Sequence, residues 1–186
     1  TVEAYPLPAL KNVNGREYKF LIDAGKTKPD MNEAFVDIWT KFKSGAAAHG
    51  FVVKDRKNGA KRDSGTKEYF DTKDQALWDK GYLIRLSKKD ASERINLTVK
   101  SIHLDALRTL ATPLMVAGSV KRVTEAEDNV GFGPGGQLGS YIEKGVSFSV
   151  EAGALGRMTL ADFGKFIPEL LTLGLPAEAP FQKLKV

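Results

Sequence analysis

The chain contains no cysteine and only two histidines, His49 and His103, among its 186 residues. Disulfide bonds and thiolate metal sites are therefore excluded, and so is a zinc site built from three histidines. Carboxylates would have to hold any metal ion, which favours magnesium, manganese or calcium over zinc. The lack of cysteine is compatible with the cytoplasm and with the periplasm, so the localisation stays unknown.

Long hydrophobic runs are also missing. The longest cover only a few residues, as in 113–117, whereas a membrane-spanning helix needs about 20 apolar residues. We therefore expect no membrane-spanning segment. The chain starts at Thr1 and shows no basic leader followed by an apolar stretch, a pattern compatible with a mature exported protein or a trimmed chain.

Charge of one sign is only slightly in excess. The 28 Lys and Arg residues against 23 Asp and Glu residues give a net charge of +5, which favours an anionic partner or simply a basic, solvated surface. The basic segment 54–67 contains no aromatic residue on which bases would stack, so nucleic acid is not the expected partner. The oligomeric state is not indicated.

What is present is an ordinary globular composition, with 42% hydrophobic and 27% charged residues, and we expect one domain over residues 1–186. An apolar stripe from Met31 to Phe42, with Asp30 as N-cap, predicts the longest helix. Shorter helical patterns cover 73–80, 102–112 and 160–173. Strand patterns cover 16–22, 51–54, 66–71, 81–87, 94–100, 119–127 and 146–151, with an extended lead-in at 1–14 and a glycine-rich loop at 131–140.

This mixture predicts an α+β fold with a largely antiparallel sheet or barrel, because strands and helices do not alternate regularly. Several strands carry charges on one face, since residues two apart point the same way. A one-sided sheet with its polar face in water explains this pattern, and so does a closed barrel with its charges turned inward. An inward-facing set would suit a polyphosphate, with cations on phosphoryl oxygens and carboxylates on a bridging metal. The charged or polar residues are Glu17, Lys19, Arg85, Thr98, Lys100, Glu125, Glu127, Ser147, Ser149 and Glu151.

Four segments resemble the CYTH superfamily, the triphosphate tunnel enzymes. They are Glu-Tyr-Lys-Phe-Leu-Ile at 17–22, Tyr-Phe-Asp-Thr at 69–72, Leu-Ile-Arg-Leu at 83–86 and Leu-Thr-Val-Lys at 97–100. The family includes inorganic triphosphatases, thiamine triphosphatases and class IV adenylyl cyclases. The resemblance covers about half of the chain and implies an eight-stranded antiparallel tunnel flanked by helices.

The resemblance also implies roles for individual residues. Phosphate contacts fall on Lys19, Arg85, Lys100 and Arg122, and ligands to Mg²⁺ or Mn²⁺ fall on Glu17, Glu127 and Glu151. Lys19, Arg85 and Glu125 would be catalytic, one of the carboxylates would orient the attacking water, and Asp71 would be structural or lie at the tunnel mouth.

Two positions depart from the family pattern. Gly15 stands where the family has a first glutamate, which should weaken the metal site, and Ser87 stands where a second arginine is common. The implied function is metal-dependent hydrolysis of a triphosphate compound, either inorganic tripolyphosphate or an organic or nucleoside triphosphate. The alternatives are a non-catalytic protein that binds polyphosphate or another small phosphate-rich anion, and an adenylyl cyclase.

Overall fold

The computed structural model describes residues 13–19, 25, 28–54, 65–90, 92–118, 121–132 and 136–185. The chain divides into two compact units, a sheet unit of Thr1–Lys19 with Ser64–Val186 and a helix unit of Phe20–Asp63. Most of the predicted lead-in, 1–12, lies outside the described residues. Among the described residues, no helix is long and apolar enough to cross a membrane.

The helix unit contains α2, Met31–Ala48, as the apolar stripe predicts. The Asp30 carboxylate accepts hydrogen bonds from the backbone N–H groups of Asn32 and Glu33 at 2.8 and 2.9 Å, which confirms the predicted N-cap. Within this unit, residues 51–54 form no strand, so that prediction was wrong.

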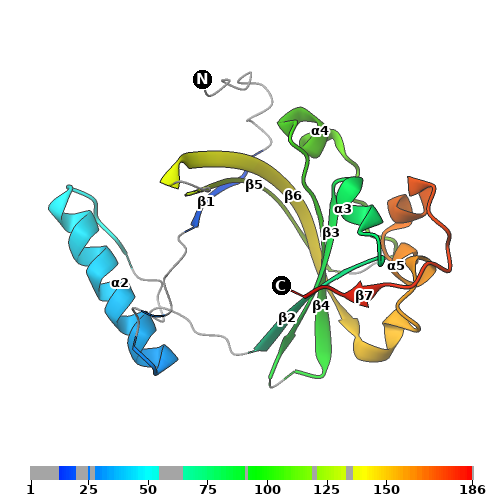
Figure 1. Ribbon diagram of the computed structural model, residues 1–186, viewed down its shortest axis with the longest axis horizontal. Coiled ribbons are helices and arrows are strands. Elements are labelled where there is room, and N and C mark those ends of the chain that lie inside the picture. Colours follow the sequence, from blue (N-terminus) through cyan, green and yellow to red (C-terminus); the bar gives the residue numbers. More distant parts are fainter. Residues whose placement is uncertain are drawn as a thin grey trace. The chain divides into compact units, whose positions relative to one another are not determined.

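In its described residues, the sheet unit has seven strands, mostly antiparallel, in the order β1-β5-β6-β4-β3-β2-β7 (Figure 1). Among the strands of the described residues, β1 and β5 pair in parallel and the other neighbouring pairs are antiparallel. The predicted α+β class with a largely antiparallel sheet is confirmed. The strands are β1 Gly15–Lys19, β2 Gly65–Asp71, β3 Tyr82–Lys89, β4 Arg94–Ser101, β5 Arg122–Phe132, β6 Leu138–Glu151 and β7 Gln182–Lys183.

The predicted closed barrel of eight strands is not found in the described part of the chain. The sheet is open, with β1 and β7 at its two edges. Strand β7 has two residues and pairs only with Phe70 and Asp71, so it offers almost no edge for further pairing. The predicted first strand runs to residue 22, but residues 20–24 lie outside the described ranges.

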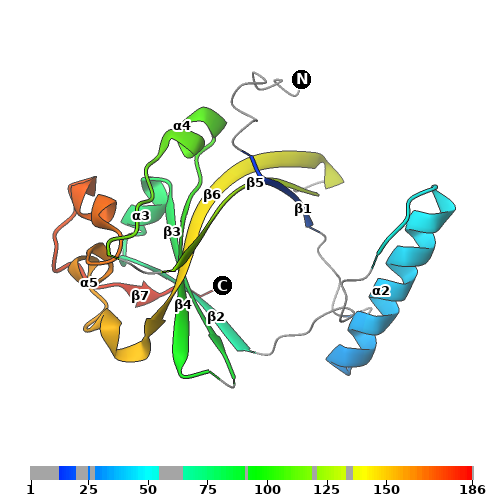
Figure 2. The ribbon, with the colours of Figure 1, turned by 180° about the vertical axis from the view of Figure 1, so that it is seen from behind.

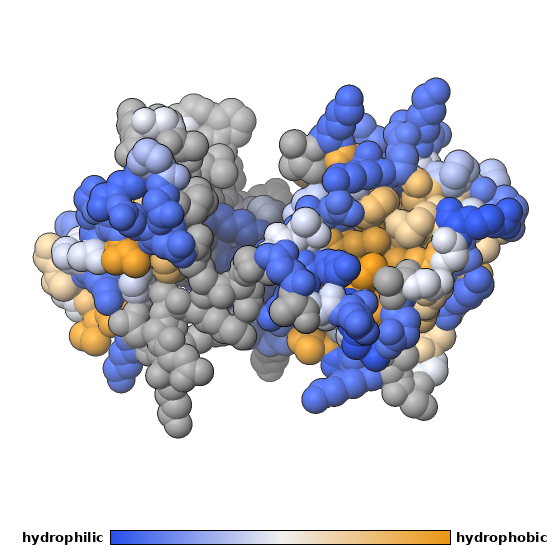
Figure 3. All heavy atoms as spheres, turned by 90° about the horizontal axis from the view of Figure 1, so that it is seen from below, coloured by the Kyte–Doolittle hydropathy of each residue, from blue (hydrophilic) through white to orange (hydrophobic). Residues whose placement is uncertain are grey.

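Short helices cover the convex face of the sheet, as the two opposite views in Figures 1 and 2 show. They are α3 Ala76–Asp79, α4 Ala106–Ala111 and α5 Leu160–Gly164, with the 3₁₀ turns η3 Ala152–Leu155 and η4 Pro168–Leu173. The core lies between them and the sheet, where Ile84, Leu97 and Val146 are completely buried. Seen from below, hydrophilic side chains border a hydrophobic area on this unit (Figure 3).

Two predicted elements have different boundaries. The helix expected at 160–173 is divided into α5 and η4, because Pro168 lacks an N–H group and its ring clashes with the preceding turn. Its apolar positions are nevertheless buried, as at Phe163 and Leu170. The glycine-rich loop expected at 131–140 is shorter, since β5 continues to Phe132 and β6 begins at Leu138.

Candidate functional site

The concave side of the sheet carries a row of polar side chains, because residues paired across neighbouring strands share a face. Arg85 pairs with Thr98, and Thr98 pairs with Ser147. Lys100 pairs with Gly145, which in turn pairs with Glu125 on β5. Among the described residues, one group of charged side chains on this side is called the charged face: Glu17, Lys19, Arg85, Lys100, Glu125, Glu127 and Glu143.

Three carboxylates of the charged face form an acidic cluster. One oxygen from each of Glu17, Glu127 and Glu143 lies within 4.8 Å of the other two. Burial raises the pKa of Glu127, and the negative charges of Glu125 and Glu17 raise it further. These three hard oxygen donors are a candidate ligand set for a divalent cation, whose charge would relieve their mutual repulsion.

Lys100 forms an ion pair with Glu143, and both side chains are largely buried. The Lys100 side chain crosses β6 over Gly145, where an added Cβ atom would lie 3.3 Å from its Cγ atom. The missing side chain at residue 145 thus leaves room for the lysine to reach the carboxylate two residues further along the strand.

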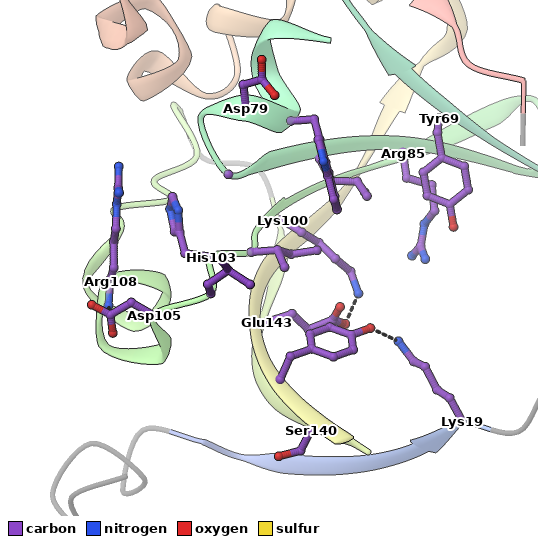
Figure 4. A pocket seen from close by; sticks show the side chains of 16 residues that line it. Lys19, Tyr69, Asp79, Arg85, Lys100, His103, Asp105, Arg108, Ser140 and Glu143 are labelled. Carbon is purple, nitrogen blue, oxygen red and sulfur yellow. Dashed lines mark hydrogen bonds and ion pairs between the residues drawn. The ribbon is translucent and has the colours of Figure 1, made fainter. Parts of the chain in front are cut away.

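Lys19 lies at the other side of the acidic cluster. Its Nζ atom donates a hydrogen bond to the Tyr141 hydroxyl at 3.2 Å and lies 3.3 Å from a Glu17 carboxylate oxygen. Burial alone would lower the pKa of Lys19, but the hydrogen bond to Tyr141 and the charge of Glu143 outweigh it, so the pKa is raised. Figure 4 shows Lys19, Lys100 and Glu143 pointing toward one another.

Arg85 reaches the charged face from β3. Its Nη2 atom donates to the Thr98 hydroxyl at 3.4 Å, and that hydroxyl lies 2.9 Å from the Ser147 hydroxyl. Within the described residues, the buried Arg85 Nε atom and the buried Ser87 hydroxyl have no hydrogen-bond partner. Arg85 therefore keeps donor capacity for an anion on this face.

The structure brings together six of the eight predicted site residues: Glu17, Lys19, Arg85, Lys100, Glu125 and Glu127. Arg122 does not join them. It pairs with Phe148, a core residue, so the register turns its side chain to the opposite side of the sheet.

Glu151 is on the correct side of the sheet but at the far end of β6. It lies eight residues from Glu143, or about 26 Å along an extended strand. Its carboxylate is 2.5 Å from Arg94 Nη1, an ion pair remote from the acidic cluster. The structure therefore replaces Glu151 with Glu143 as the third carboxylate of that cluster.

Sequence reasoning missed Glu143 because the predicted strand started only at Val146, after Lys144 and Gly145. The available signal was the alternation of faces along the strand, since Glu143 lies four residues before Ser147 and shares its face.

Asn129 was also missed. It is completely buried, pairs with Glu17 and Tyr141 across the sheet, and its Oδ1 atom has no partner among the described residues.

Asp71 has the structural role that was one of its two predicted roles. Its buried carboxylate accepts hydrogen bonds from the backbone N–H groups of Leu77 and Trp78, each at 2.9 Å. It thereby fixes α3 at the end of β2.

A cavity of about 1020 Å³ opens beside the charged face. Lys19, Arg85, Lys100 and Glu143 line one part of it, and residues from the α3 and α4 region line another (Figure 4). Comparison of the chain with family models, with curated proteins and with solved structures finds no match. The function is therefore argued from this geometry.

Proposed function

We propose that the protein hydrolyses a triphosphate compound on the charged face, with Mg²⁺ or Mn²⁺ held by Glu17, Glu127 and Glu143. The observation that carries the proposal is the acidic cluster lying among three cations, Lys19, Arg85 and Lys100, on one side of one sheet. The proposal includes a CYTH-type tunnel. The curvature of the sheet supports it (Figure 1), and so does the register that places these charges on one side of the sheet.

The three cations suit a chain of phosphoryl groups. Arginine binds two oxygens of a phosphoryl group at once, whereas lysine acts as a point charge. Arg85 would hold the phosphoryl group nearest β3, and Lys19 and Lys100 would neutralise the charge that develops on phosphoryl oxygens as the bond to the leaving group breaks.

A bound divalent ion would withdraw charge from the phosphoryl oxygens and make the phosphorus more open to attack. Glu125 lies next to the cluster on β5 and would accept a hydrogen bond from the attacking water. Water adds its oxygen to the terminal phosphorus, the bridging oxygen leaves with the rest of the chain, and the proton passes through the carboxylate to solvent.

The charge balance favours a metal-dependent enzyme over a simple anion binder. Four carboxylates, Glu17, Glu125, Glu127 and Glu143, face three cations there. A metal ion on these carboxylates would offset their repulsion of the phosphates. The departures at Gly15 and Ser87 favour the second candidate, a non-catalytic binder of polyphosphate, because each removes a group that catalysis would use.

The test is phosphate release from tripolyphosphate, ATP and thiamine triphosphate in Mg²⁺, Mn²⁺ or EDTA. We expect metal-dependent release that falls about 100-fold in Lys19→Ala and in Glu143→Gln, the loss typical of one transition-state contact. Arg122→Ala and Glu151→Gln are the matched controls, since they remove the same charges from outside the cluster. Both should keep turnover within about twofold of the wild type.

Absence of release with every metal, from folded protein that still binds tripolyphosphate, would replace the enzyme with the binder. Equal losses in Arg122→Ala and Lys19→Ala would contradict the position of the site.

A further inference from the structure

The wall of the cavity changes from charged to apolar within two residues along each of two strands. On β3, Leu83 lies two residues before Arg85. At the end of β4, Ile102 and Leu104 follow Lys100 at steps of two, and all of these residues line the same cavity. Two residues of extended chain cover about 7 Å. A molecule longer than a phosphoryl group therefore meets both surfaces.

Trp78 provides an aromatic surface at the apolar end. Its side chain lines the cavity, and the residue is 53% exposed. Its backbone is held in place, because the Asp71 carboxylate accepts hydrogen bonds from the backbone N–H groups of Leu77 and Trp78. Leu104, on the same wall, is fully exposed. A ligand that covers apolar side chains lining a cavity removes them from water, which stabilises the complex.

We infer that the substrate is a triphosphate ester with a planar aromatic ring, bound by Trp78, Ile102 and Leu104 while its phosphates lie on Lys19, Arg85 and Lys100. The inference rests on the proposed triphosphate site. The volume of about 1020 Å³ supports it, since cavities of about 300–1,000 Å³ hold organic ligands of drug size. Inorganic tripolyphosphate would use only the charged end.

The experiment measures kcat/KM and binding by calorimetry for ATP and thiamine triphosphate against inorganic tripolyphosphate, all with Mn²⁺. Stacking of a base on an aromatic side chain contributes about 1–3 kcal/mol, or about 5- to 150-fold in affinity. We expect Trp78→Ala to weaken at least one of the two esters about tenfold or more and to change tripolyphosphate less than twofold. Trp78→Phe should restore most of the ester affinity.

Leu104→Ser and Leu107→Ser form a matched pair. Both leucines are exposed and belong to the α4 region, but only Leu104 lines the cavity. Leu104→Ser should lower the affinity for the esters and not for tripolyphosphate. Leu107→Ser should leave the affinity for all three ligands unchanged.

The two proposals fail separately. If the esters bind more tightly than tripolyphosphate and Trp78→Ala removes that preference, the ring site holds even where no phosphate is released. If tripolyphosphate binds or turns over as well as both esters and Trp78→Ala affects none of them, the ring site is overturned and hydrolysis stands. Failure of all three ligands to bind overturns both.

Discussion

The Lys100–Glu143 ion pair depends on a residue without a side chain. Gly145 pairs with Lys100 across the sheet, and the lysine lies over it on the way to the carboxylate. Because β6 is extended here, the glycine is needed for space and not for an unusual backbone angle. Breaking this ion pair should be strongly destabilising, because it leaves one charge buried without a partner of opposite sign.

We predict that Gly145→Val displaces Lys100 from Glu143 and lowers the free energy of unfolding by about 1–3 kcal/mol, the usual range for overfilling a packed site. Urea unfolding with the same probe for each variant measures the change. Gly139→Val is the control, because it lies on the same strand and face but has no atom within 4 Å of an added Cβ. Equal stability of the two variants would contradict the spatial role of Gly145.

Six of the eight residues predicted for the site do lie together on one face, because alternation along a strand determines which side chains share a face. Alternation does not determine the register between neighbouring strands. The position of Arg122 depends on its register with Phe148, and the choice between Glu151 and Glu143 depends on how far β6 extends. Register and strand length are decided by pairing with a distant segment, which a local pattern does not contain.

At the scale of elements, two helix boundaries depend on single residues that act on the backbone beside them. Asp30 caps α2, and Pro168 separates α5 from η4, because both act through the backbone groups of nearby residues. Closure of the sheet failed as a prediction for the opposite reason. It depends on whether the edges β1 and β7 find partners, and β7 is only two residues long.

The start of α5 shows how a local cap makes stability depend on pH. Thr159 and Asp162 form a capping box, and the Asp162 carboxylate also accepts hydrogen bonds from the Arg157 backbone and from Lys165 Nζ. The bond to Lys165, followed by those to Thr159, lowers the pKa of Asp162 far below its ordinary 3.8. Only the charged carboxylate makes all of these contacts.

A lowered pKa in the folded state means that Asp162 stabilises the protein fully above pH 3.8 and loses this effect as the pH falls further. Asp162→Asn should therefore unfold at lower urea concentration than the wild type at pH 7, and the difference should shrink between pH 4 and 2. Glu178→Gln, which removes an exposed carboxylate paired with Arg157, is the control. A difference that stays constant with pH would contradict the role of the charge.

At the scale of the whole molecule, net charge and local charge have opposite signs. The chain carries +5, but the four carboxylates and three cations of the charged face sum to −1. The basic excess lies elsewhere, where it attracts anions to the protein as a whole. If the charged face holds a metal ion and a polyphosphate as proposed, each should reduce the repulsion that the other meets, and we predict that metal and substrate bind with positive cooperativity.

Gly15 lies beside the acidic cluster, so a charged residue at this position would change its charge. An added Cβ atom there would be 3.6 Å from the Cγ and Oε1 atoms of Glu127, an ordinary contact, so a side chain fits and points at the acidic cluster. Gly15→Glu would bring a fourth carboxylate to the three that already lie within 4.8 Å of one another. Without metal, the added repulsion should lower the thermal stability of the protein.

With metal, the same change should raise the affinity for Mn²⁺ on the order of tenfold, because hard cations respond to the number of charged ligands. Calorimetric titration with Mn²⁺ alone measures this without reference to turnover. Gly153→Glu adds the same charge on η3, where an added Cβ meets nothing within 4 Å, and should leave Mn²⁺ affinity unchanged. If Gly15→Glu destabilises the metal-free protein and Mn²⁺ fails to restore it, the carboxylates repel one another without forming a metal site.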